Sequence, residues 1–294
     1  MTGKGDPVAC CMTIRDILQD AAASLRDAGF ISPRLDAEIL LAHSLGKERL
    51  FFFTNPDHVL TNDDILRFRR LLVRRLGREP VAYIVGSKPF WSLVLDVDRR
   101  VLIPRPETEI LVEEVLKIAS RSDNVSTGIV DVGTGSGAIS LAFASELQQV
   151  RLTATDISPE AIQAARANAR KVGLDHRIAF VVGDMVRCFA GPFDMLVSNP
   201  PYIPAGDYDA LPEGVRRFEP RIALWGGPEG LSFYEELIGE GGRVLRKGGW
   251  LCLEMGAGQR ARIEDLLNMS GLYGELRFRT DYAGIDRVVV ARRR

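Results

Sequence analysis

The pattern of apolar and polar residues changes twice along the chain. Residues 13–78 place apolar side chains at helical spacing, which predicts a small N-terminal helical bundle behind a tail at residues 1–12. Residues 79–105 alternate β-branched and polar residues around Gly86, which predicts a β-hairpin linker. Residues 106–294 alternate strand-like and helix-like segments, which favours an α/β domain with a mostly parallel sheet and right-handed crossovers.

Helix boundaries in the N-terminal part are marked by capping residues. Ser32 followed by Pro33 is typical of a helix start, and Gly46 is typical of a helix end. A further helix is expected to begin at Asn62, with apolar residues at helical spacing on one face: Ile65, Phe68, Leu72 and Leu76. The run at residues 51–53 contains three phenylalanines, which we expect to fill a core.

Two hairpins are predicted from paired apolar runs. In the linker, residues 83–85 and 93–97 read as its strands. At the end of the chain, residues 273–280 and 285–291 read as a second hairpin, joined by a turn at residues 281–284.

Four strand-like runs of the α/β part each end in a polar or glycine-rich feature. The runs are residues 129–132, 151–155, 178–182 and 193–198. The features that follow them are, in the same order, Gly133–Gly137, Asp156, Asp184 and Asn199–Tyr202. Because the carboxyl ends of parallel strands face one crevice, we expect these features to converge on a ligand site. Taken alone, each acid could equally be a helix N-cap or a solvated turn residue.

The glycine-rich loop at residues 133–137 favours close approach of backbone to a ligand, because glycine tolerates positive φ and has no side chain. A dinucleotide fingerprint would place its third glycine three residues after the second, so nicotinamide binding is disfavoured. Asp156 stands about twenty residues further on, where an acidic side chain can hold ribose hydroxyls.

The tetrapeptide Asn199-Pro200-Pro201-Tyr202 favours a site for a planar NH₂ group. Prolines hold the backbone rigid and leave carbonyl acceptors without competing N–H donors. The Asn199 side chain adds another acceptor, and Tyr202 adds a flat aromatic wall. The alternative is an ordinary Asn-Pro turn after a strand. The adjacent strand ends favour the site for an amide or a nucleobase amine.

Together these features resemble the class I S-adenosylmethionine-dependent methyltransferases, and the tetrapeptide resembles the subset that methylates planar nitrogens. Residues 79–86 and 101–109 are similar to the glutamine methyltransferases that modify peptide chain release factors. Further similarities lie at residues 218–231 and 281–290, so that the resemblance covers about residues 13–293. Related enzymes that modify a ribosomal protein share the tetrapeptide but typically differ where this chain has Glu107-Thr108-Glu109.

The resemblance implies a Rossmann-like sheet with an antiparallel last strand, and S-adenosyl-L-methionine as the cofactor. The implied cofactor-binding residues are Gly133, Thr134, Gly135, Ser136, Gly137, Asp156, Asp184, Met185 and Asn199. The implied substrate-binding residues are Asn199, Pro200, Pro201 and Tyr202, with catalytic roles for Asn199, Pro200 and Tyr202. The family often has an aromatic residue at the position of Met185, whose side chain can also pack on an adenine face.

The implied activity is methylation of the side-chain amide nitrogen of the glutamine in the Gly-Gly-Gln loop of release factors. The alternatives are glutamine methylation of a ribosomal protein and methylation of an adenine or guanine amino group. Base methylation in a duplex needs base flipping and a basic groove, and a net charge of −1 does not favour it. A cofactor-binding module without catalysis is disfavoured by the intact tetrapeptide.

Composition adds few constraints. At 294 residues and 46% hydrophobic content, the chain suits one large and one small domain. Arginines gather at residues 67–78 and 292–294, where solvated faces are the simplest interpretation and binding of release factors or RNA is the alternative. The four cysteines show no C-x-x-C spacing and the three histidines are scattered, so we expect no metal site. We expect a cytoplasmic monomer with no membrane association and no stable nucleic acid partner.

The segment at residues 205–230 is rich in proline, glycine and arginine. Long loops in compact domains often serve function. We therefore expect a flap that faces the substrate.

Overall fold

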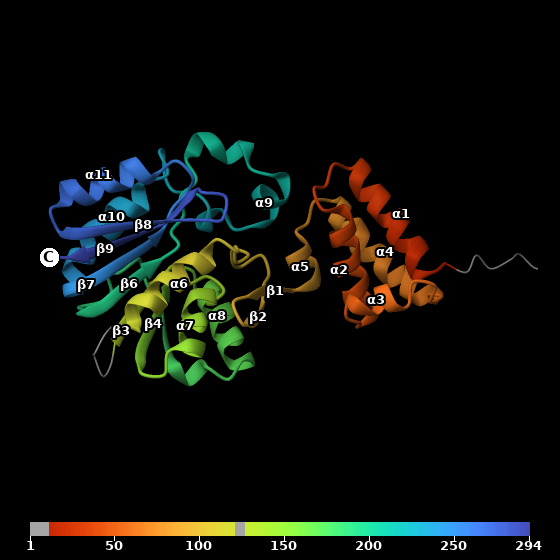
Figure 1. Cartoon of the computed structure of the whole chain (residues 1–294), viewed down its shortest axis with the longest axis horizontal. Coiled ribbons are helices and arrows are strands. Elements are labelled where there is room, and N and C mark those ends of the chain that lie inside the picture. The colour runs from red at the N-terminus through yellow and green to blue at the C-terminus, as the bar shows by residue number, and fades with distance from the viewer. Residues whose placement is uncertain (1–11, 121–126) are drawn as a thin grey trace, which may run out of the picture. The chain divides into compact units, whose positions relative to one another are not determined.

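The computed structural model describes residues 12–120 and 127–294. The predicted tail therefore lies outside the described residues apart from Met12, as do Cys10 and Cys11. The chain forms two compact units, Met1–Val85 and Gly86–Arg294 (Figure 1).

The first unit is helical in the part that the structure describes. Its helices are α1 (Ile14–Asp27), α2 (Pro33–Leu45), α3 (Leu50–Thr54), α4 (Asn62–Leu76) and α5 (Val81–Val85). Thr13 and Thr61 cap α1 and α4, each paired with an Asp three residues later in a capping box. Gly46 ends α2 in the left-handed conformation, at φ +61°.

Apolar side chains from these helices form one core, which includes Leu18, Leu40, Phe52 and Phe68. Phe52 is buried in it, but Phe53 is 64% exposed, so the prediction that the phenylalanine run fills a core is wrong at Phe53. The five-residue helix α3 explains the difference, because successive residues of a helix point to different sides.

The prediction of a strand at residues 83–85 is wrong. These residues lie in the short helix α5, where the N–H groups of Tyr83 and Ile84 bond to the Pro80 carbonyl at 3.0 and 3.1 Å. Tyr83 and Ile84 are both buried, and Ile84 joins the core of the first unit. Burial of these side chains outweighs their β propensity, which depends strongly on context.

The linker hairpin itself is present, but it belongs to the second unit and is shorter than the predicted linker. It consists of β1 (Ser87–Phe90) and β2 (Leu93–Asp96), paired antiparallel. The chain divides into its two compact units after Val85, within the predicted linker at residues 79–105.

The second unit is built on a sheet of seven strands, in the order β5-β4-β3-β6-β7-β9-β8. The strands are β3 (Thr127–Val132), β4 (Val150–Asp156), β5 (Ile178–Val182), β6 (Phe193–Ser198), β7 (Leu245–Glu254), β8 (Tyr273–Thr280) and β9 (Asp286–Arg293). The first five in spatial order pair in parallel, and β9 pairs antiparallel with both β7 and β8. The predicted mostly parallel sheet with an antiparallel last strand is confirmed.

Helices cover both faces of this sheet (Figure 1). They are α6 (Thr108–Ala119), α7 (Ala138–Glu146), α8 (Pro159–Lys171), α9 (Glu213–Phe218), α10 (Ser232–Val244) and α11 (Arg260–Ser270), with short 3₁₀ turns at Asp175–Arg177, Ala205–Ala210 and Arg221–Ala223. Neighbouring strand residues point to opposite faces. Ile129 accordingly packs with α6 and α7, whereas Val130 packs with α10 and α11.

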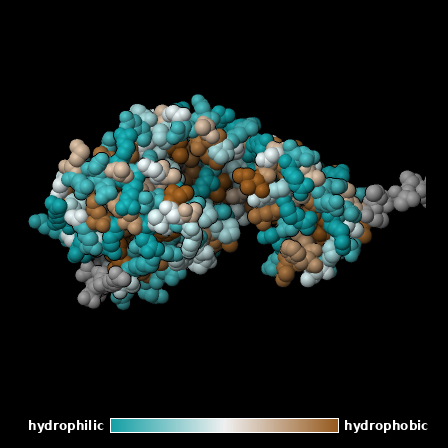
Figure 2. Space-filling view, turned by 45° about the horizontal axis from the view of Figure 1, so that its top comes forward, coloured by the Kyte–Doolittle hydropathy of each residue, from teal (hydrophilic) through white to brown (hydrophobic). Residues whose placement is uncertain are grey.

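The surface mixes polar and apolar side chains. On the face drawn in Figure 2, apolar side chains lie among hydrophilic ones. Within the described residues, no helix combines the length and the apolar character that crossing a bilayer would require.

Candidate functional site

The structure brings the four predicted strand ends together around one cavity, here called the glycine-loop cavity. Its lining includes Gly133, Gly135, Asp156, Asp184, Met185 and Asn199. These residues lie at or just after the carboxyl ends of β3, β4, β5 and β6, which are neighbours in the sheet. This is the crevice in which open α/β sheets bind their ligands.

The glycine loop opens its backbone toward this cavity at two positions. Gly133 and Gly135 have φ of +73° and +56°, and a Cβ added to either would meet nothing within 4 Å. Thr134, Ser136 and Gly137 do not line the cavity. Thr134 and Ser136 are buried, and a Cβ on Gly137 would lie 3.2 Å from the Ala165 Cβ. The implied contacts of these three residues with a cofactor remain a prediction.

Asp131, inside β3, holds the glycine loop from beneath. Its Oδ2 accepts hydrogen bonds from the Thr134 hydroxyl at 2.7 Å and from the Ser140 hydroxyl at 2.6 Å and N–H at 3.2 Å. Its Oδ1 is buried without a hydrogen-bond partner among the described residues. Burial raises the pKa of Asp131 to about 6, although these donors oppose the shift. The role of Asp131 was not predicted from the sequence, although an acidic residue within the apolar run at residues 129–132 is the signal that could have indicated it.

Asp156 lies at the cavity with its carboxylate held by backbone. Oδ2 accepts from the Gly135 N–H at 2.9 Å, and Oδ1 accepts from the Ser158 N–H at 3.0 Å. Burial raises the pKa of Asp156, and these N–H groups act in the opposite sense. The residue therefore connects the glycine loop to the start of α8.

Asp184 and Met185 also line the glycine-loop cavity. The Asp184 carboxylate pairs with Arg187, and it remains partly exposed. Met185 has φ of +51°, a conformation that side-chain-bearing residues seldom adopt.

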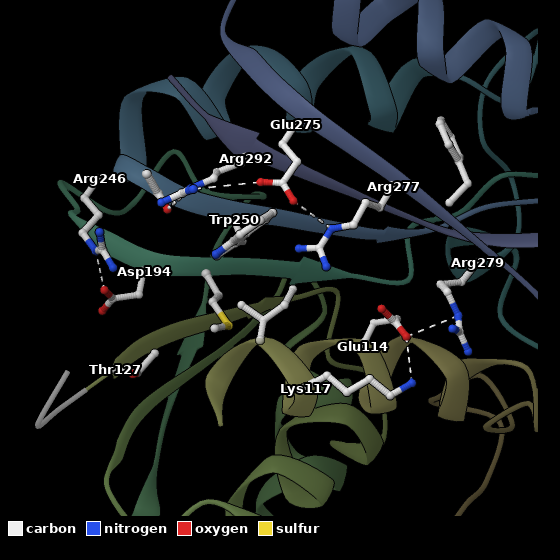
Figure 3. Close-up of a pocket in the computed structure, with 14 residues that line it drawn as sticks. Glu114, Lys117, Thr127, Asp194, Arg246, Trp250, Glu275, Arg277, Arg279 and Arg292 are labelled. Atoms are coloured by element: carbon white, nitrogen blue, oxygen red, sulfur yellow. Dashed lines mark hydrogen bonds and ion pairs between the residues drawn. The ribbon is translucent and has the colours of Figure 1, made fainter. Parts of the chain in front are cut away.

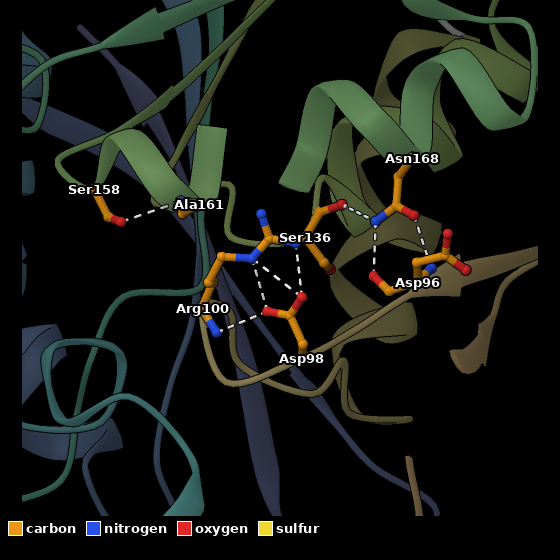
Figure 4. Close-up of polar contacts among 7 residues, drawn as sticks. All are labelled: Asp96, Asp98, Arg100, Ser136, Ser158, Ala161 and Asn168. Carbon is orange, nitrogen blue, oxygen red and sulfur yellow. Dashed lines mark hydrogen bonds and ion pairs between the residues drawn. The ribbon is translucent and has the colours of Figure 1, made fainter. Parts of the chain in front are cut away.

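A buried asparagine ties the glycine loop to the hairpin. Asn168 of α8 donates from Nδ2 to the Ser136 carbonyl at 2.9 Å and the Asp96 carbonyl at 3.0 Å. Its Oδ1 accepts from the Asp96 N–H at 2.7 Å, so every polar atom of this fully buried side chain is used (Figure 4). The neighbouring segment continues to Arg100, which pairs with Asp98 and lines the glycine-loop cavity.

The tetrapeptide separates the glycine-loop cavity from a second one, here called the tetrapeptide cavity. Pro200, Tyr202 and Arg105 line the tetrapeptide cavity, whereas Pro201 lines the glycine-loop cavity. Asn199 lines both. Within the described residues, no hydrogen bond is formed to the Asn199 Oδ1 or the Pro200 carbonyl oxygen. Two acceptors thus remain available where the cavities meet.

Glycines at residues 226–230 allow the chain to pack directly on the tetrapeptide backbone. A Cβ on Gly226 would lie 2.7 Å from the Tyr202 Cα and 2.8 Å from the Pro201 carbonyl oxygen, closer than real side chains come. Gln259 adds hydrogen bonds from its Nε2 to the carbonyls of Tyr202 and Gly230, both at 3.1 Å. The position of Tyr202 is therefore determined by close packing and hydrogen bonding.

The predicted flap is anchored by a buried ion pair. Glu219, whose side chain is 1% exposed, accepts from the Arg105 guanidinium at 2.6 Å and from the Ile103 N–H at 3.1 Å. The same segment contributes Ala223 to both cavities. The expected flap therefore contains α9 and two short 3₁₀ turns, and it lies against the tetrapeptide.

A cavity of about 720 Å³, larger than the two at the tetrapeptide (about 150 and 280 Å³), lies at the opposite, amino-terminal end of the parallel strands. Trp250 stands between Arg277 and Arg292 there (Figure 3). The carboxylates that line this larger cavity pair with cations: Glu275 with Arg277, Glu114 with Lys117 and Arg279, and Asp194 with Arg246. The larger cavity is thus lined by ion pairs and is not the site to which the strand ends point.

Comparison with known proteins decides the family. The chain is 41% identical over 283 residues to the release factor glutamine methyltransferase of Chlorobaculum tepidum, covering 94% of this chain and 95% of that protein. The chain belongs to the release factor glutamine methyltransferase family. The Moorella thermoacetica member is also 41% identical, over 96% of this chain and 99% of its own length. The resemblance that the motifs indicated is confirmed.

Two family models match parts of this family member. The PrmC N-terminal domain matches residues 16–86, and the methyltransferase small domain matches residues 106–211. Among solved structures, a methyltransferase from Pyrococcus furiosus is 18% identical with a TM-score of 0.52, and it covers 74% of this chain and 98% of its own. That likeness supports the methyltransferase fold.

Proposed function

We propose that the protein transfers a methyl group from S-adenosyl-L-methionine to the side-chain amide nitrogen of the glutamine in the Gly-Gly-Gln loop of peptide chain release factors. The observation that carries this proposal is that Asn199 lines both cavities. A cofactor in one cavity and a glutamine side chain in the other would meet at this residue. The printed names of the relatives support the same activity.

The residues of the glycine-loop cavity fit the cofactor. Gly133 and Gly135 leave room for a ligand against the backbone, and Asp131 offers an unpartnered buried oxygen beneath them. We assign Asp156 to the ribose hydroxyls and Met185 to the adenine face. When bound, S-adenosyl-L-methionine supplies a methyl group on an electrophilic sulfonium, which needs no metal or covalent intermediate.

The tetrapeptide would make the amide nitrogen a better nucleophile by position and polarity. An amide nitrogen lone pair is delocalised into its carbonyl. The Asn199 Oδ1 and the Pro200 carbonyl oxygen would accept the two N–H hydrogens and favour a more pyramidal nitrogen. They would also stabilise the positive charge that develops there. Tyr202 would cover the face of the amide.

Alignment of the reacting atoms is the larger contribution that the protein can make, up to about 7–11 kcal/mol. The new N–C bond forms as the C–S bond breaks, and the nitrogen then loses a proton. No basic side chain belongs to the tetrapeptide, so we propose that the proton leaves to solvent after transfer.

The first unit is the proposed substrate-recognition domain, and the flap at residues 205–230 is the proposed wall over the glutamine. We further propose that the enzyme acts as a monomer in the cytoplasm, because translation factors are its proposed substrates. Neither a membrane nor a stable nucleic acid partner enters the proposal.

Radiolabel transfer tests the function. The purified protein is incubated with methyl-labelled S-adenosyl-L-methionine and, separately, a release factor, its Gln→Ala loop variant, and nucleic acid. We expect label on the wild-type factor alone. Label on nucleic acid alone would favour base methylation, and label on the loop variant would exclude the Gly-Gly-Gln glutamine as the acceptor.

A further inference from the structure

Gln259 joins the two ends of the flap at residues 205–230. It directly precedes α11, and its Nε2 donates hydrogen bonds to the carbonyls of Tyr202 and Gly230, both at 3.1 Å. Tyr202 lies just before the flap, and Gly230 is the last residue of the flap. One side-chain amide from a distant segment thus bridges the base of the flap.

Backbone groups determine the orientation of this side-chain amide. The Gly256 N–H donates to the Gln259 Oε1 at 2.9 Å, and a backbone N–H can only donate. The two carbonyl oxygens at the base of the flap can only accept, so they require the NH₂ group. A flipped amide would place N–H against N–H and oxygen against oxygen, so the observed orientation is the one that satisfies all three backbone groups.

Two glycines let the backbone approach the Gln259 amide closely. A Cβ on Gly230 would collide with the Tyr202 carbonyl oxygen and would lie 2.9 Å from the Gln259 Nε2. A Cβ on Gly256 would lie 2.9 Å from the Gln259 Oε1 and 3.0 Å from the Tyr202 Cδ2. The space beside each glycine is therefore too small for a side chain, and the three segments are packed tightly around the amide.

The flap and the residue at its base line the same cavity. Leu211, Val215 and Leu224 of the flap line the tetrapeptide cavity together with Tyr202. The Ile203 N–H donates to the Leu224 carbonyl at 2.9 Å, so the returning part of the flap lies beside the chain that leaves the tetrapeptide. A closed base therefore keeps the Tyr202 wall and the flap wall of the tetrapeptide cavity in place together.

We propose that Gln259 is a positioning residue that holds the flap closed over the substrate glutamine. This inference rests on the proposed function, because it takes the tetrapeptide cavity as the site of the glutamine side chain. Gln259 does not belong to the described lining of either cavity, so it acts through Tyr202 and the flap. Closed loops of this kind complete a catalytic site and orient the substrate in it. An open flap would leave the bound glutamine misplaced relative to the methyl group, and turnover would fall.

Two substitutions at Gln259 separate its NH₂ group from the rest of the side chain. Gln259→Met keeps the length of the side chain but removes both polar groups. Gln259→Glu keeps an acceptor for the Gly256 N–H but presents a carboxylate oxygen to the carbonyls at the base of the flap. With a release factor as substrate, we expect both variants to lower kcat about 10- to 100-fold, because misplacing a reacting group by about 1 Å can cost that much. The cofactor Kd should change less than about twofold. Gln163→Met, at an exposed position of α8, is the matched control.

Limited digestion with trypsin measures the flap in the absence of any substrate. Arg216 and Arg217 are exposed in α9 of the flap. We expect cleavage after these arginines to be at least about fivefold faster in both Gln259 variants, at a temperature at which thermal unfolding shows every protein to be folded, because local opening exposes the backbone.

Three results would overturn the inference: wild-type kcat in Gln259→Glu, unchanged flap cleavage in both variants, or a loss of thermal stability with kcat unchanged. Failure of the proposed function is distinct from these results. The wild type would then not label the release factor, whereas flap cleavage would still respond to the substitutions at Gln259.

Discussion

The glycine loop and the tetrapeptide end neighbouring parallel strands, β3 and β6, yet they are held in different ways. Asp131 supports the glycine loop through Thr134 and Ser140, at most nine residues away in sequence. The tetrapeptide is instead held by distant residues, such as Thr108 at 91 residues and Gln259 at 57 residues. The glycine loop has further partners in Asp156 and Asn168, at 21 and 32 residues, so all of these partners lie closer in sequence than Thr108 and Gln259 do to the tetrapeptide.

This difference suggests how the two halves of the site respond to change. The glycine loop depends on β3, on the end of β4 and on α8, which lie close together in sequence. The tetrapeptide depends on the flap, on α6 and on the loop before α11 together. Substitutions at the glycine loop should therefore alter cofactor binding, and substitutions around the tetrapeptide should alter turnover.

Removal of the Asn199 side chain should give the largest effect. We expect Asn199→Ala to lower kcat about 100- to 1,000-fold, the usual cost of losing one preorganised group in the transition state. Cofactor affinity, measured by calorimetry, should remain within about twofold of the wild type. Asn268→Ala, on an exposed position of α11, is the control. An equally large loss of cofactor affinity would refute the division between the two halves.

Asp156→Ala should show the opposite pattern. We expect a cofactor Kd about 10- to 100-fold higher, because hydrogen bonds to a charged group contribute about 1.5–3 kcal/mol. At saturating cofactor, kcat should stay close to that of the wild type. Asp156→Asn retains one acceptor, so its cofactor Kd should lie between those of the wild type and Asp156→Ala. If cofactor binding does not change in Asp156→Ala, the ribose assignment is wrong.

A smaller effect is expected from Gly226→Ala. The added Cβ would lie 2.7 Å from the Tyr202 Cα, so the tetrapeptide must shift. We expect kcat to fall about tenfold and thermal stability to decrease, with little change in cofactor affinity. Gly206→Ala in the same flap is the matched control, because its Cβ would meet nothing within 4 Å and its φ is not positive. Equal effects of the two substitutions would show that close packing at Gly226 does not matter.

The comparison also explains which parts could be predicted from sequence. The strands β5 and β6 and the strand ends around the site follow short-range periodicity, and they were predicted correctly. Tyr83 and Ile84 were assigned to a strand because burial in the helical core cannot be seen in a local window. The sequence marked Thr108 only as part of the Glu107-Thr108-Glu109 motif, because its hydrogen bond with Asn199 joins residues that are 91 positions apart.

The smallest expected effect concerns Asp131, and it is an effect on the stability of the folded protein. Its pKa in the folded protein, about 6, lies above the usual 3.8, so the folded state binds more protons between these values. Protonation of Asp131 therefore stabilises the folded protein, and this stabilisation is fully present below about pH 4 and is lost as pH rises through about 6.

Asp131→Asn removes that titration. From pH 4.5 to pH 7, we expect the free energy of unfolding of the variant to rise relative to the wild type, by on the order of 2 kcal/mol. Urea denaturation at both pH values measures the difference, and other titrating groups cancel because they are common to both proteins. If the free energies of unfolding of the variant and the wild type differ by the same amount at both pH values, burial does not destabilise the Asp131 carboxylate.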